Sequence, residues 1–505
     1  MRFTPARHFL AFAALSFVLY MPSLRGEFIM DDWGYITQST WVTESPSPLH
    51  YWTTFEQADF WPLSYTFYWV FYRLFGENPV PYHVVNVLLH ALNAALVLAL
   101  ARRFGIRWPL WAALLFLVHP LHVQAVAWVI QFKTLSSTAL ALASVLFYQR
   151  FLQGEGRRQA WFSLAAFALA MLAKSSAVFL PVILLVMTMR RPRRDLVRLL
   201  PFFILSLLGG LSTVLVNEWN VIDRTAPVFQ MSLLDRPALM VQNLFFYLKS
   251  FLLPVRLAYM YPSTVPSLAG AVDVLIVLSV LALGCLSWRY RWVHGRGFFL
   301  FGYLVLLLPS LGLVSIPNMK LSLVTDHWAY LPDAFLAIFL GAILPANDSR
   351  TVRILVLLPL LVLAVLGFRH ARTFAGEEAF WLRAREVNPE NAAPAYNLGT
   401  VYGKKKRVVD SIGQYRRALQ LDPSHDRAWF NLARAFMLVR EYEDAEQCLL
   451  RVVSLNPGMV MAYIGLSQVY LIAGRDAEAR RIVQKGLELN PGNSELAARL
   501  DQLAR

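Results

Sequence analysis

The sequence predicts an all-α membrane protein, a bundle of helices that crosses the bilayer many times and is followed by a solenoid of short helix pairs. Hydrophobic residues make up 57% of the 505 residues and charged residues only 16%, whereas soluble domains average about 25% charged residues. Long uncharged runs recur as far as residue 368. Beyond that point the chain becomes polar, and a short motif returns at a fixed interval.

The uncharged runs mark the predicted spans. The first run follows Arg2 and Arg7, as in a signal peptide. It lacks a small-residue cleavage site, so we expect it to be retained as a span. Several runs are shorter than the ~20 residues that a span usually needs, so their bounds are soft. About 11 spans are expected, near residues 8–24, 80–101, 108–119, 132–149, 160–173, 175–189, 199–217, 268–288, 298–316, 334–346 and 354–368.

The segment 237–253 decides the orientation. It is apolar but contains Lys249 and is followed by Pro254, so we interpret it as a re-entrant or interfacial segment. The arginine-rich segments 190–194 and 288–296 then fall on the same side as the N-terminus. Because basic loops stay in the cytoplasm, we expect a cytoplasmic N-terminus and a C-terminus outside.

Charge and cysteine content exclude several other classes. Of the formal net charge of +15, about +12 lies in residues 1–387, so the basic excess belongs to the membrane part. No nucleic-acid-binding motif accompanies it, and we expect no nucleic-acid partner. The two cysteines, Cys285 and Cys448, indicate no disulfide framework. No cysteine and histidine cluster has zinc spacing.

The first long loop, residues 25–79, carries an acidic pair in "GEFIMDDWGYITQ". Asp31 and Asp32 have many aromatic neighbours, and aromatic side chains favour the headgroup region. We therefore expect a loop that lies on the membrane, with interfacial helices such as 63–75. The pair is either a solvated loop feature or part of a reaction site.

Polar residues also stand at the ends of apolar runs. "HPLHVQAVAWVIQFK" contains His119, His122 and Lys133, and "LAKSS" contains Lys174. Histidines three residues apart share a helix face, so a metal is conceivable, but without a nearby acid we favour helix-end residues at the interface. The lysines either snorkel or meet a lipid phosphate. A further stripe is expected to face the bundle interior: His83, Asn86, His90 and Asn93.

A last polar group lies between two late spans, in "NMKLSLVTDHWAYLPD". It contains Lys320, Asp326, His327 and Tyr330 in a short loop. With the orientation above, this loop, the acidic pair and the two lysines share one side of the membrane.

A regular repeat follows. The dipeptides "NP", "DP", "NP" and "NP" begin at residues 388, 422, 456 and 490, which is a spacing of 34, the tetratricopeptide period. Small residues where paired helices cross follow the same spacing, as do large apolar residues: Ser411, Ala445 and Ala479; Leu398, Leu432 and Leu466; Tyr402, Phe436 and Tyr470.

Two domains follow from these patterns, a membrane domain over 1–368 and a repeat domain over 369–505. The repeat domain is expected to contain a partial repeat, three full repeats and a polar cap, over 374–391, 392–425, 426–459, 460–493 and 494–505. Its groove either binds a protein or peptide, with Asn397 and Asn431 as weak candidates for contact, or serves as a spacer.

Together these segments resemble the bacterial relatives of the transmembrane and tetratricopeptide-repeat O-mannosyltransferases, which are GT-C-type membrane glycosyltransferases. The quoted "HPLH" segment, "PYHVVNVLLHALNAALVL", "LAKSSAVFLPVILL" and "DHWAYLP" carry the resemblance in order, over nearly the whole chain. Relatives often have an acid where Gln124 stands and an arginine where His327 stands, so His327 would bind phosphate only when protonated.

The resemblance implies a glycosyltransferase that moves a sugar from a polyprenyl-phosphate donor to a hydroxyl, on protein in those relatives, at the extracytoplasmic face. It implies a bacterial inner membrane and an essential acidic motif, Asp31-Asp32, in which we favour Asp32 as the general base. Lys133, Lys174, Lys320 and His327 are the candidates for donor phosphate binding, with His119, His122, Asp326 and Tyr330 as further site candidates. No cofactor is required, and a divalent metal is possible but not indicated.

Two alternatives stay open. One is the same chemistry on a glycan or lipid acceptor, and the other is a non-enzymatic membrane scaffold that assembles partners through its repeats. The expected partners are therefore the lipid-linked sugar, membrane lipids and an acceptor protein or peptide.

Overall fold

The computed structural model describes residues 4–55, 59–189, 191–220, 230–232, 235–262, 297–313, 319, 321–345 and 349–504. All regular structure in these ranges is helical, as predicted. The chain divides into two compact units, Met1–Gly376 and Glu377–Arg505. The last long helix of the first unit runs to Ala371, so this division lies a few residues beyond the predicted boundary at 368.

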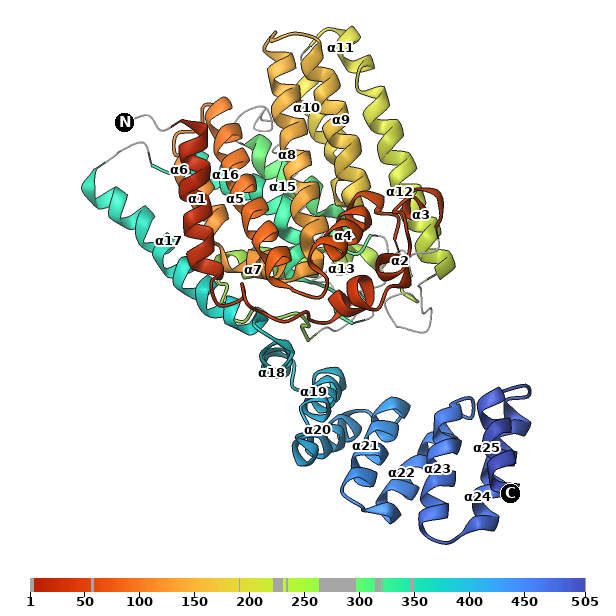
Figure 1. Ribbon diagram of the computed structural model, residues 1–505. Helices are drawn as coiled ribbons and strands as arrows, with labels where there is room; N and C mark the ends of the chain where they lie inside the picture. Colours follow the sequence, from red (N-terminus) through yellow and green to blue (C-terminus); the bar gives the residue numbers. More distant parts are fainter. Residues whose placement is uncertain are drawn as a thin grey trace. The chain divides into compact units, whose positions relative to one another are not determined.

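The first unit is a bundle of apolar helices (Figure 1). Within it α8 packs along α9, and α5 packs against α1, α6 and α8. Proline opens several helices, for example Pro62 in α4 and Pro109 in α6, because the first turn needs no backbone donor at that position. The longer helices are α1 (Pro5–Tyr20), α4 (Pro62–Phe75), α5 (Val80–Arg103), α6 (Pro109–Val118), α8 (Phe132–Leu152), α9 (Arg158–Ala173), α12 (Leu200–Asn220), α13 (Arg236–Leu252), α15 (Gly297–Leu307), α16 (Tyr330–Ile343) and α17 (Arg350–Ala371).

Short helical segments connect these helices. Most lie where two longer helices meet, and several belong to the predicted site segments. They are η1 (Trp33–Thr37), α2 (Thr40–Thr43), α3 (His50–Thr53), η2 (Pro120–His122), α7 (Val123–Ala127), η3 (Val129–Gln131), η4 (Ser175–Ala177), α10 (Leu180–Thr188), α11 (Arg193–Val197), η7 (Leu308–Ser310), η9 (Asp326–Ala329) and η10 (Arg372–Phe374).

Four helical stretches in the described residues are long and apolar enough to cross a membrane: Val80–Arg103, Val129–Leu152, Asp195–Val216 and Arg350–Phe374. A pair bent by 51°, Pro109–Val118 with Pro120–Ala127, makes a fifth if it is one span. The other apolar helices found are shorter, and the predicted run 268–288 lies outside the described residues. The count of about 11 spans therefore stays a prediction.

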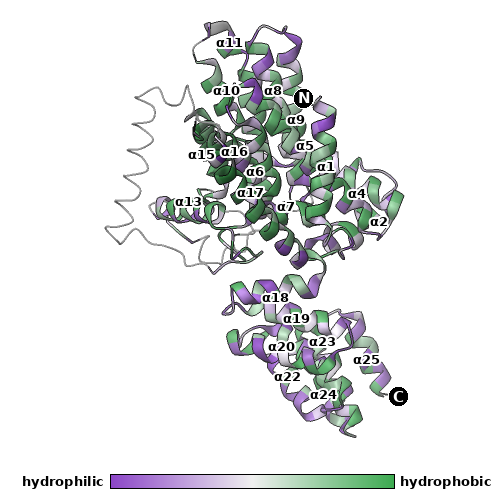
Figure 2. Cartoon of the chain, turned by 90° about the vertical axis from the view of Figure 1, so that its left-hand side faces the viewer, coloured by the Kyte–Doolittle hydropathy of each residue, from purple (hydrophilic) through white to green (hydrophobic). Residues whose placement is uncertain are grey.

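The segment expected to be re-entrant or interfacial forms α13, a helix of 17 residues. It is not among the helices long and apolar enough to span. Its inner face buries polar side chains, including Asn243 and Tyr247, which bond to backbone carbonyls of the later loops. Hydrophobic residues instead dominate α6, α15 and α16 (Figure 2).

The second unit consists of paired short helices, as the 34-residue period predicted. They are α18 (Glu377–Val387), α19 (Ala392–Lys404), α20 (Val408–Leu421), α21 (Asp426–Leu438), α22 (Tyr442–Leu455), α23 (Val460–Ile472), α24 (Asp476–Leu489) and α25 (Ser494–Ala504). The predicted small residues at the helix crossings are buried, as are the large apolar ones. The paired helices approach so closely that a side chain at Gly399 would collide with the Tyr415 ring.

Candidate active site

The two acids of the first loop have different surroundings. Asp32 is fully buried, and its carboxylate accepts backbone N–H bonds from Ile29 at 3.0 Å and from Ile130 at 2.7 Å. Ile130 lies in η3, just before α8. Asp32 therefore fastens the first loop to the start of that helix, and both of its oxygens are already engaged.

Asp31 is only partly buried, and its carboxylate accepts no hydrogen bond from the residues that the structure describes. Burial raises the pKa of Asp31 above its usual value, and the Lys133 ammonium opposes this rise. Burial raises the pKa of Asp32 as well, so the two acids differ in their partners: a carboxylate that accepts no hydrogen bond is more available to a substrate proton than one whose two oxygens are held by backbone donors. The geometry therefore favours Asp31, whereas the sequence argument favoured Asp32.

Lys133 begins α8 and is 8% exposed. Its ammonium lies over two aromatic rings, 4.3 Å from the centre of the Trp61 ring and 5.3 Å from that of Tyr35. Within the described ranges, no carboxylate forms an ion pair with it. The aromatic faces hold the cation by cation–π attraction, and its N–H donors remain available.

Lys174 ends α9 and is 9% exposed. Its Nζ donates to Thr134 Oγ1 at 2.8 Å, and that hydroxyl donates to Gln131 Oε1 at 2.6 Å. Lys133 and Lys174 are close enough for their charges to repel each other. No carboxylate forms a direct ion pair with either ammonium group in the described structure, although Asp59, Asp31 and Asp32 attract Lys133 and Asp59 attracts Lys174. Two buried ammonium groups with unused N–H donors form a site suited to an anion.

A third carboxyl group, Asp59, was missed in the sequence reasoning. Burial raises its pKa to about 7, against the opposing charges of Lys133 and Lys174. Nothing in the spacing of Asp59 relative to those lysines identified it, because the three residues meet only in the folded chain. The aromatic content of the loop was the one available signal, since Trp61 lies two residues further on.

The late loop places His327 beside the lysines, but not as a cation. Its Nδ1 is 2.8 Å from the Thr325 hydroxyl, and its backbone N–H donates to Gln124 Oε1 at 3.0 Å. Burial lowers the pKa of His327 far below its usual value, and Lys174 and Lys133 lower it further. This shift opposes protonation of His327, and its role as a donor phosphate ligand stays a prediction. Lys320 lies outside the described residues.

Asp326 takes part in the anchoring of the late loop. Its Oδ1 accepts the Tyr261 hydroxyl at 2.6 Å, and the Tyr261 backbone N–H donates to Ser322 Oγ at 3.1 Å. Tyr247 of α13 donates to the Thr325 carbonyl at 3.3 Å. The acid is thus held between α13 and the loop.

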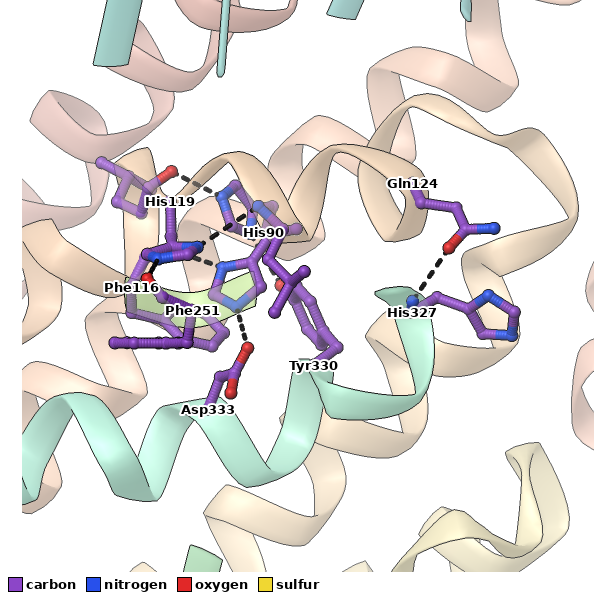
Figure 3. A network of polar contacts seen from close by, with 11 residues as sticks. His90, Phe116, His119, Gln124, Phe251, His327, Tyr330 and Asp333 are labelled. Atoms are coloured by element: carbon purple, nitrogen blue, oxygen red, sulfur yellow. Dashed lines mark hydrogen bonds and ion pairs between the residues drawn. The ribbon is translucent and has the colours of Figure 1, made fainter. Parts of the chain in front are cut away.

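His119 and Tyr330 belong to a second buried network, which Figure 3 shows with His90 and Asp333. The His122 ring lies against the rings of both. His122 Nε2 lies 3.2 Å from Asp333 Oδ2, and Tyr330 bonds to His90 Nδ1 at 2.7 Å. All four predicted polar residues of the α5 stripe are buried here or nearby, as expected. His119 and His122 do lie at helix ends, as expected, since His119 directly follows α6 and His122 ends η2, but they are buried in the bundle and not exposed at the interface.

The ring nitrogens of this network have partners. His119 Nε2 donates to the Phe251 carbonyl at 2.9 Å, and its Nδ1 accepts the Leu121 N–H. His90 Nε2 donates to the Leu117 carbonyl at 2.9 Å, which leaves its Nδ1 to accept the Tyr330 hydroxyl. No group of three or more potential metal ligands is present among the described residues.

The two asparagines of the repeat unit lie on the first helices of successive repeats and are half-buried. Asn397 donates to the Ala393 carbonyl at 2.9 Å, and Asn431 donates to the Tyr396 hydroxyl at 3.3 Å. Each side chain is therefore oriented by a bond within the repeat unit.

Comparison with known proteins agrees with the resemblance inferred from the sequence. Residues 60–219 match the family model described as dolichyl-phosphate-mannose-protein mannosyltransferase. Three overlapping matches to a tetratricopeptide repeat model cover 375–426, 396–447 and 430–494. The first match includes Lys133, Lys174 and the helix α4.

Curated proteins named as protein O-mannosyl-transferases are similar to this chain. A Drosophila melanogaster protein, Tmtc1, is 34% identical over 27% of this chain and 18% of its own length. A human protein, TMTC2, is 30% identical over 30% of this chain and 20% of its own length. A Caenorhabditis elegans protein is 22% identical over 82% of this chain and 62% of its own length. The matches to the first two thus span about a fifth of those relatives.

Solved tetratricopeptide structures are similar in part. The first repeat domain of Spaghetti (RPAP3), bound to an HSP90 peptide, is 23% identical over 23% of this chain and 94% of its own, with a TM-score of 0.22. MamA is 22% identical over 27% of this chain and 77% of its own, with a TM-score of 0.24. Because these scores are low, the repeat assignment rests on the sequence matches and on the helix pairs themselves.

Proposed function

We propose that this chain is a membrane glycosyltransferase that moves a sugar, mannose by its relatives, from a polyprenyl-phosphate donor to a hydroxyl group on a protein. The observation that carries this proposal is the placement of one carboxylate that accepts no hydrogen bond, Asp31, near the buried Lys133, which forms no ion pair among the described residues and is close to a second buried lysine, Lys174. A base next to an anion site is what transfer from a phosphate leaving group requires.

In this mechanism the lysines bind the donor phosphate and Asp31 acts as the general base. The acceptor hydroxyl loses its proton to the Asp31 carboxylate while its oxygen bonds to the anomeric carbon of the sugar. The bond from that carbon to the phosphate oxygen breaks, and its electron pair stays on the phosphate. Lys133 and Lys174 stabilise the charge that develops there. Such a single displacement inverts the anomeric configuration.

Asp32 has a supporting role in the proposed mechanism. Its two backbone bonds hold the loop to η3, and this contact keeps Asp31 near the start of α8. Adjacent residues point in different directions, so one acid can face the substrate while the other fixes the chain.

Charge at the two ends of the helices supports an extracytoplasmic site. Lys133 begins α8, whereas Arg150 near its end pairs with Glu155 at 2.7 Å. About 26 Å separates these two positions along a helix. Arg103 at the end of α5 also pairs with Glu155. Because the arginine-rich end is expected to face the cytoplasm, the lysine site faces outward, toward the periplasm in a bacterium.

The repeat unit is the proposed binding surface for a protein acceptor. Tetratricopeptide repeats stack into extended concave surfaces of the kind used for polypeptide binding, and the half-buried Asn397 and Asn431 lie on equivalent helices of successive repeats. Amide side chains in such a groove can hydrogen-bond an extended peptide backbone.

The test is transfer by the full chain in lipid nanodiscs. Polyprenyl-phosphate mannose carrying a radioactive label is supplied with a serine- and threonine-rich peptide, and products are mapped by mass spectrometry. We expect mannose on hydroxyl side chains of the peptide. Transfer only to glycan or lipid would replace the acceptor assignment, and donor binding without any transfer would support the scaffold alternative. GDP-mannose in place of the lipid-linked donor should give no product.

A further inference from the structure

The ammonium of Lys133 lies over two aromatic rings, and no carboxylate among the described residues forms a direct ion pair with it, although Asp59, Asp31 and Asp32 attract its charge. We infer that Trp61 is a positioning residue that holds Lys133 for the donor phosphate and so determines how tightly the donor binds. This inference rests on the proposed function, and it adds a residue outside the acidic motif and the lysine pair.

The contact between Trp61 and Lys133 is direct. The Lys133 Nζ lies 4.3 Å from the centre of the Trp61 ring, and the lysine is 8% exposed. Water is therefore largely excluded from the pair, and a cation–π contact is stronger under these conditions. The tyrosine on the other side, Tyr35, is further away at 5.3 Å.

An aromatic face has a property that a carboxylate lacks. It attracts the ammonium through the quadrupole of the ring but accepts no strong hydrogen bond. The N–H donors of Lys133 then stay free for phosphate oxygens. A carboxylate at the same place would occupy those donors and repel the incoming phosphate. Trp61 therefore fixes the cation without competing with the proposed ligand.

Trp61 is itself fixed relative to both lysines, because it directly precedes α4. In the first turns of this helix Ser64 Oγ donates to the Ala173 carbonyl at 2.8 Å, next to Lys174. The hydroxyl of Tyr68 donates to the Ile130 carbonyl at 2.7 Å. The helix α4 is thus bonded to the segments that precede Lys133 and Lys174.

A stacked aromatic pair completes this attachment. The rings of Phe67 and Phe132 have centres 3.5 Å apart and planes 4° apart. Phe132 directly precedes Lys133. Three contacts from one helix thus converge on the two lysine segments, which is the arrangement expected of an element that sets their positions.

Trp69 provides a matched control on the same helix. The guanidinium of Arg73 lies 4.8 Å from the centre of its ring, and its indole N–H donates to the Ser45 carbonyl at 2.9 Å. Trp69 is half-buried like Trp61 and forms the same kind of contact, but its cation is not one of the site lysines.

The experiment uses the full chain in nanodiscs and the variants Trp61→Leu, Trp61→Phe, Trp69→Leu, Lys133→Met and Trp61→Leu combined with Lys133→Met. Two quantities are measured, the KM and kcat for polyprenyl-phosphate mannose and the Kd for polyprenyl phosphate without sugar. The second reports on anion binding in the absence of any transfer.

We expect Trp61→Leu to raise KM and Kd about 10- to 30-fold, the loss that corresponds to a desolvated cation–π contact. The value of kcat should change less than KM, and Trp61→Phe should recover most of the affinity. Trp69→Leu should leave KM near that of the parent. In the Lys133→Met background, Trp61→Leu should change KM and Kd less than about twofold, because the cation that Trp61 holds is gone.

Equal effects of Trp61→Leu in both backgrounds would overturn the inference, as would equal losses from Trp61→Leu and Trp69→Leu. If Trp61→Leu fails to insert, the Trp61→Phe variant and its combination with Lys133→Met decide by the same criterion. A parent protein that does not bind polyprenyl phosphate would instead refute the proposed function and this inference with it. If the parent binds polyprenyl phosphate but the effects of Trp61→Leu and Lys133→Met simply add, the inference is refuted and the proposed function stands.

Discussion

Two buried polar clusters lie in the first unit, and they differ in how their polar atoms are satisfied. In the lysine site, Lys174 bonds to one hydroxyl and Lys133 lies against rings, so several donors are unpaired. In the histidine network, the imidazoles of His90 and His119 each use both nitrogens. The lysines of the one cluster and the histidines of the other are all buried.

The difference separates a ligand site from a structural one. Burial of a cation without a counterion is costly, and such an arrangement is retained where a bound anion later provides the missing partner. In the histidine network the imidazoles of His90 and His119 bond to groups of the bundle itself, although Asp333 Oδ1 and Asn93 Oδ1 have no partner in the described structure. Such internal bonds specify how the helices pack. The unused N–H donors of two buried ammonium groups therefore identify the candidate site.

The largest effect is expected at the acidic pair. Asp31→Asn keeps the shape of the side chain and removes its basicity, so kcat for transfer should fall by ~10²–10⁴, the usual contribution of a general base. Asp32→Asn should lower kcat less and should mainly reduce thermal stability, because it weakens the contacts to Ile29 and Ile130. Donor binding by each variant is measured alongside. Full activity of the double variant would remove the pair from the mechanism.

A smaller effect is expected for the second lysine. Lys174→Met should weaken donor binding by about 1.5–3 kcal/mol, the range for hydrogen bonds to charged groups. The control is Lys249→Met, since Lys249 is exposed on α13. The Kd for polyprenyl phosphate is the measurement. If Lys174→Met and the control bind equally well, the lysine serves only the packing around Thr134.

The histidine network should respond in the opposite way. His119→Phe keeps the stacking on Phe251 but leaves the Phe251 carbonyl and the Leu121 N–H without a partner. Unfolding should become easier by about 1–3 kcal/mol, while KM for the donor stays within about twofold of the parent value. Thermal unfolding in detergent and donor KM are compared. A large rise in KM at unchanged stability would place His119 in the site.

The smallest effect is a shift in pH dependence. Burial raises the pKa of Asp31, so the protonated, inactive form should persist to a higher pH than for an exposed aspartate, and kcat/KM should fall as the pH is lowered through that pKa. Because the Lys133 charge lowers this pKa, Lys133→Met should move the acidic limb of the profile to higher pH. The profile is also recorded for Asp59→Asn, whose parent group has a pKa of about 7. If Asp59→Asn alone removes the acidic limb of the kcat/KM profile, the limb reports the titration of Asp59 and not that of Asp31.

The repeat unit and the helical class could be read from the sequence because they rest on local patterns. A 34-residue period places Leu398, Leu432 and Leu466 at equivalent positions, and all three are buried. The polar stripe of α5 was predicted to face inward from its helical spacing alone, and it does. Such patterns involve residues within one helix or one repeat, so their consequences do not depend on distant parts of the chain.

The division of roles in the first unit depended on contacts between distant segments. Asp31 and Asp32 are adjacent and identical in type, and they differ in burial and in the backbone bonds that Asp32 accepts, one of them from the Ile130 N–H, 98 residues away. Asp59 interacts with the charge of Lys133, and the Trp61 ring contacts its ammonium, although both lie more than 70 positions earlier in the chain. Likewise, Gln124 accepts the backbone N–H of His327, 203 residues away. The chemistry of each group is set by the dielectric, charge and donors around it, and the folded chain alone assembles those surroundings.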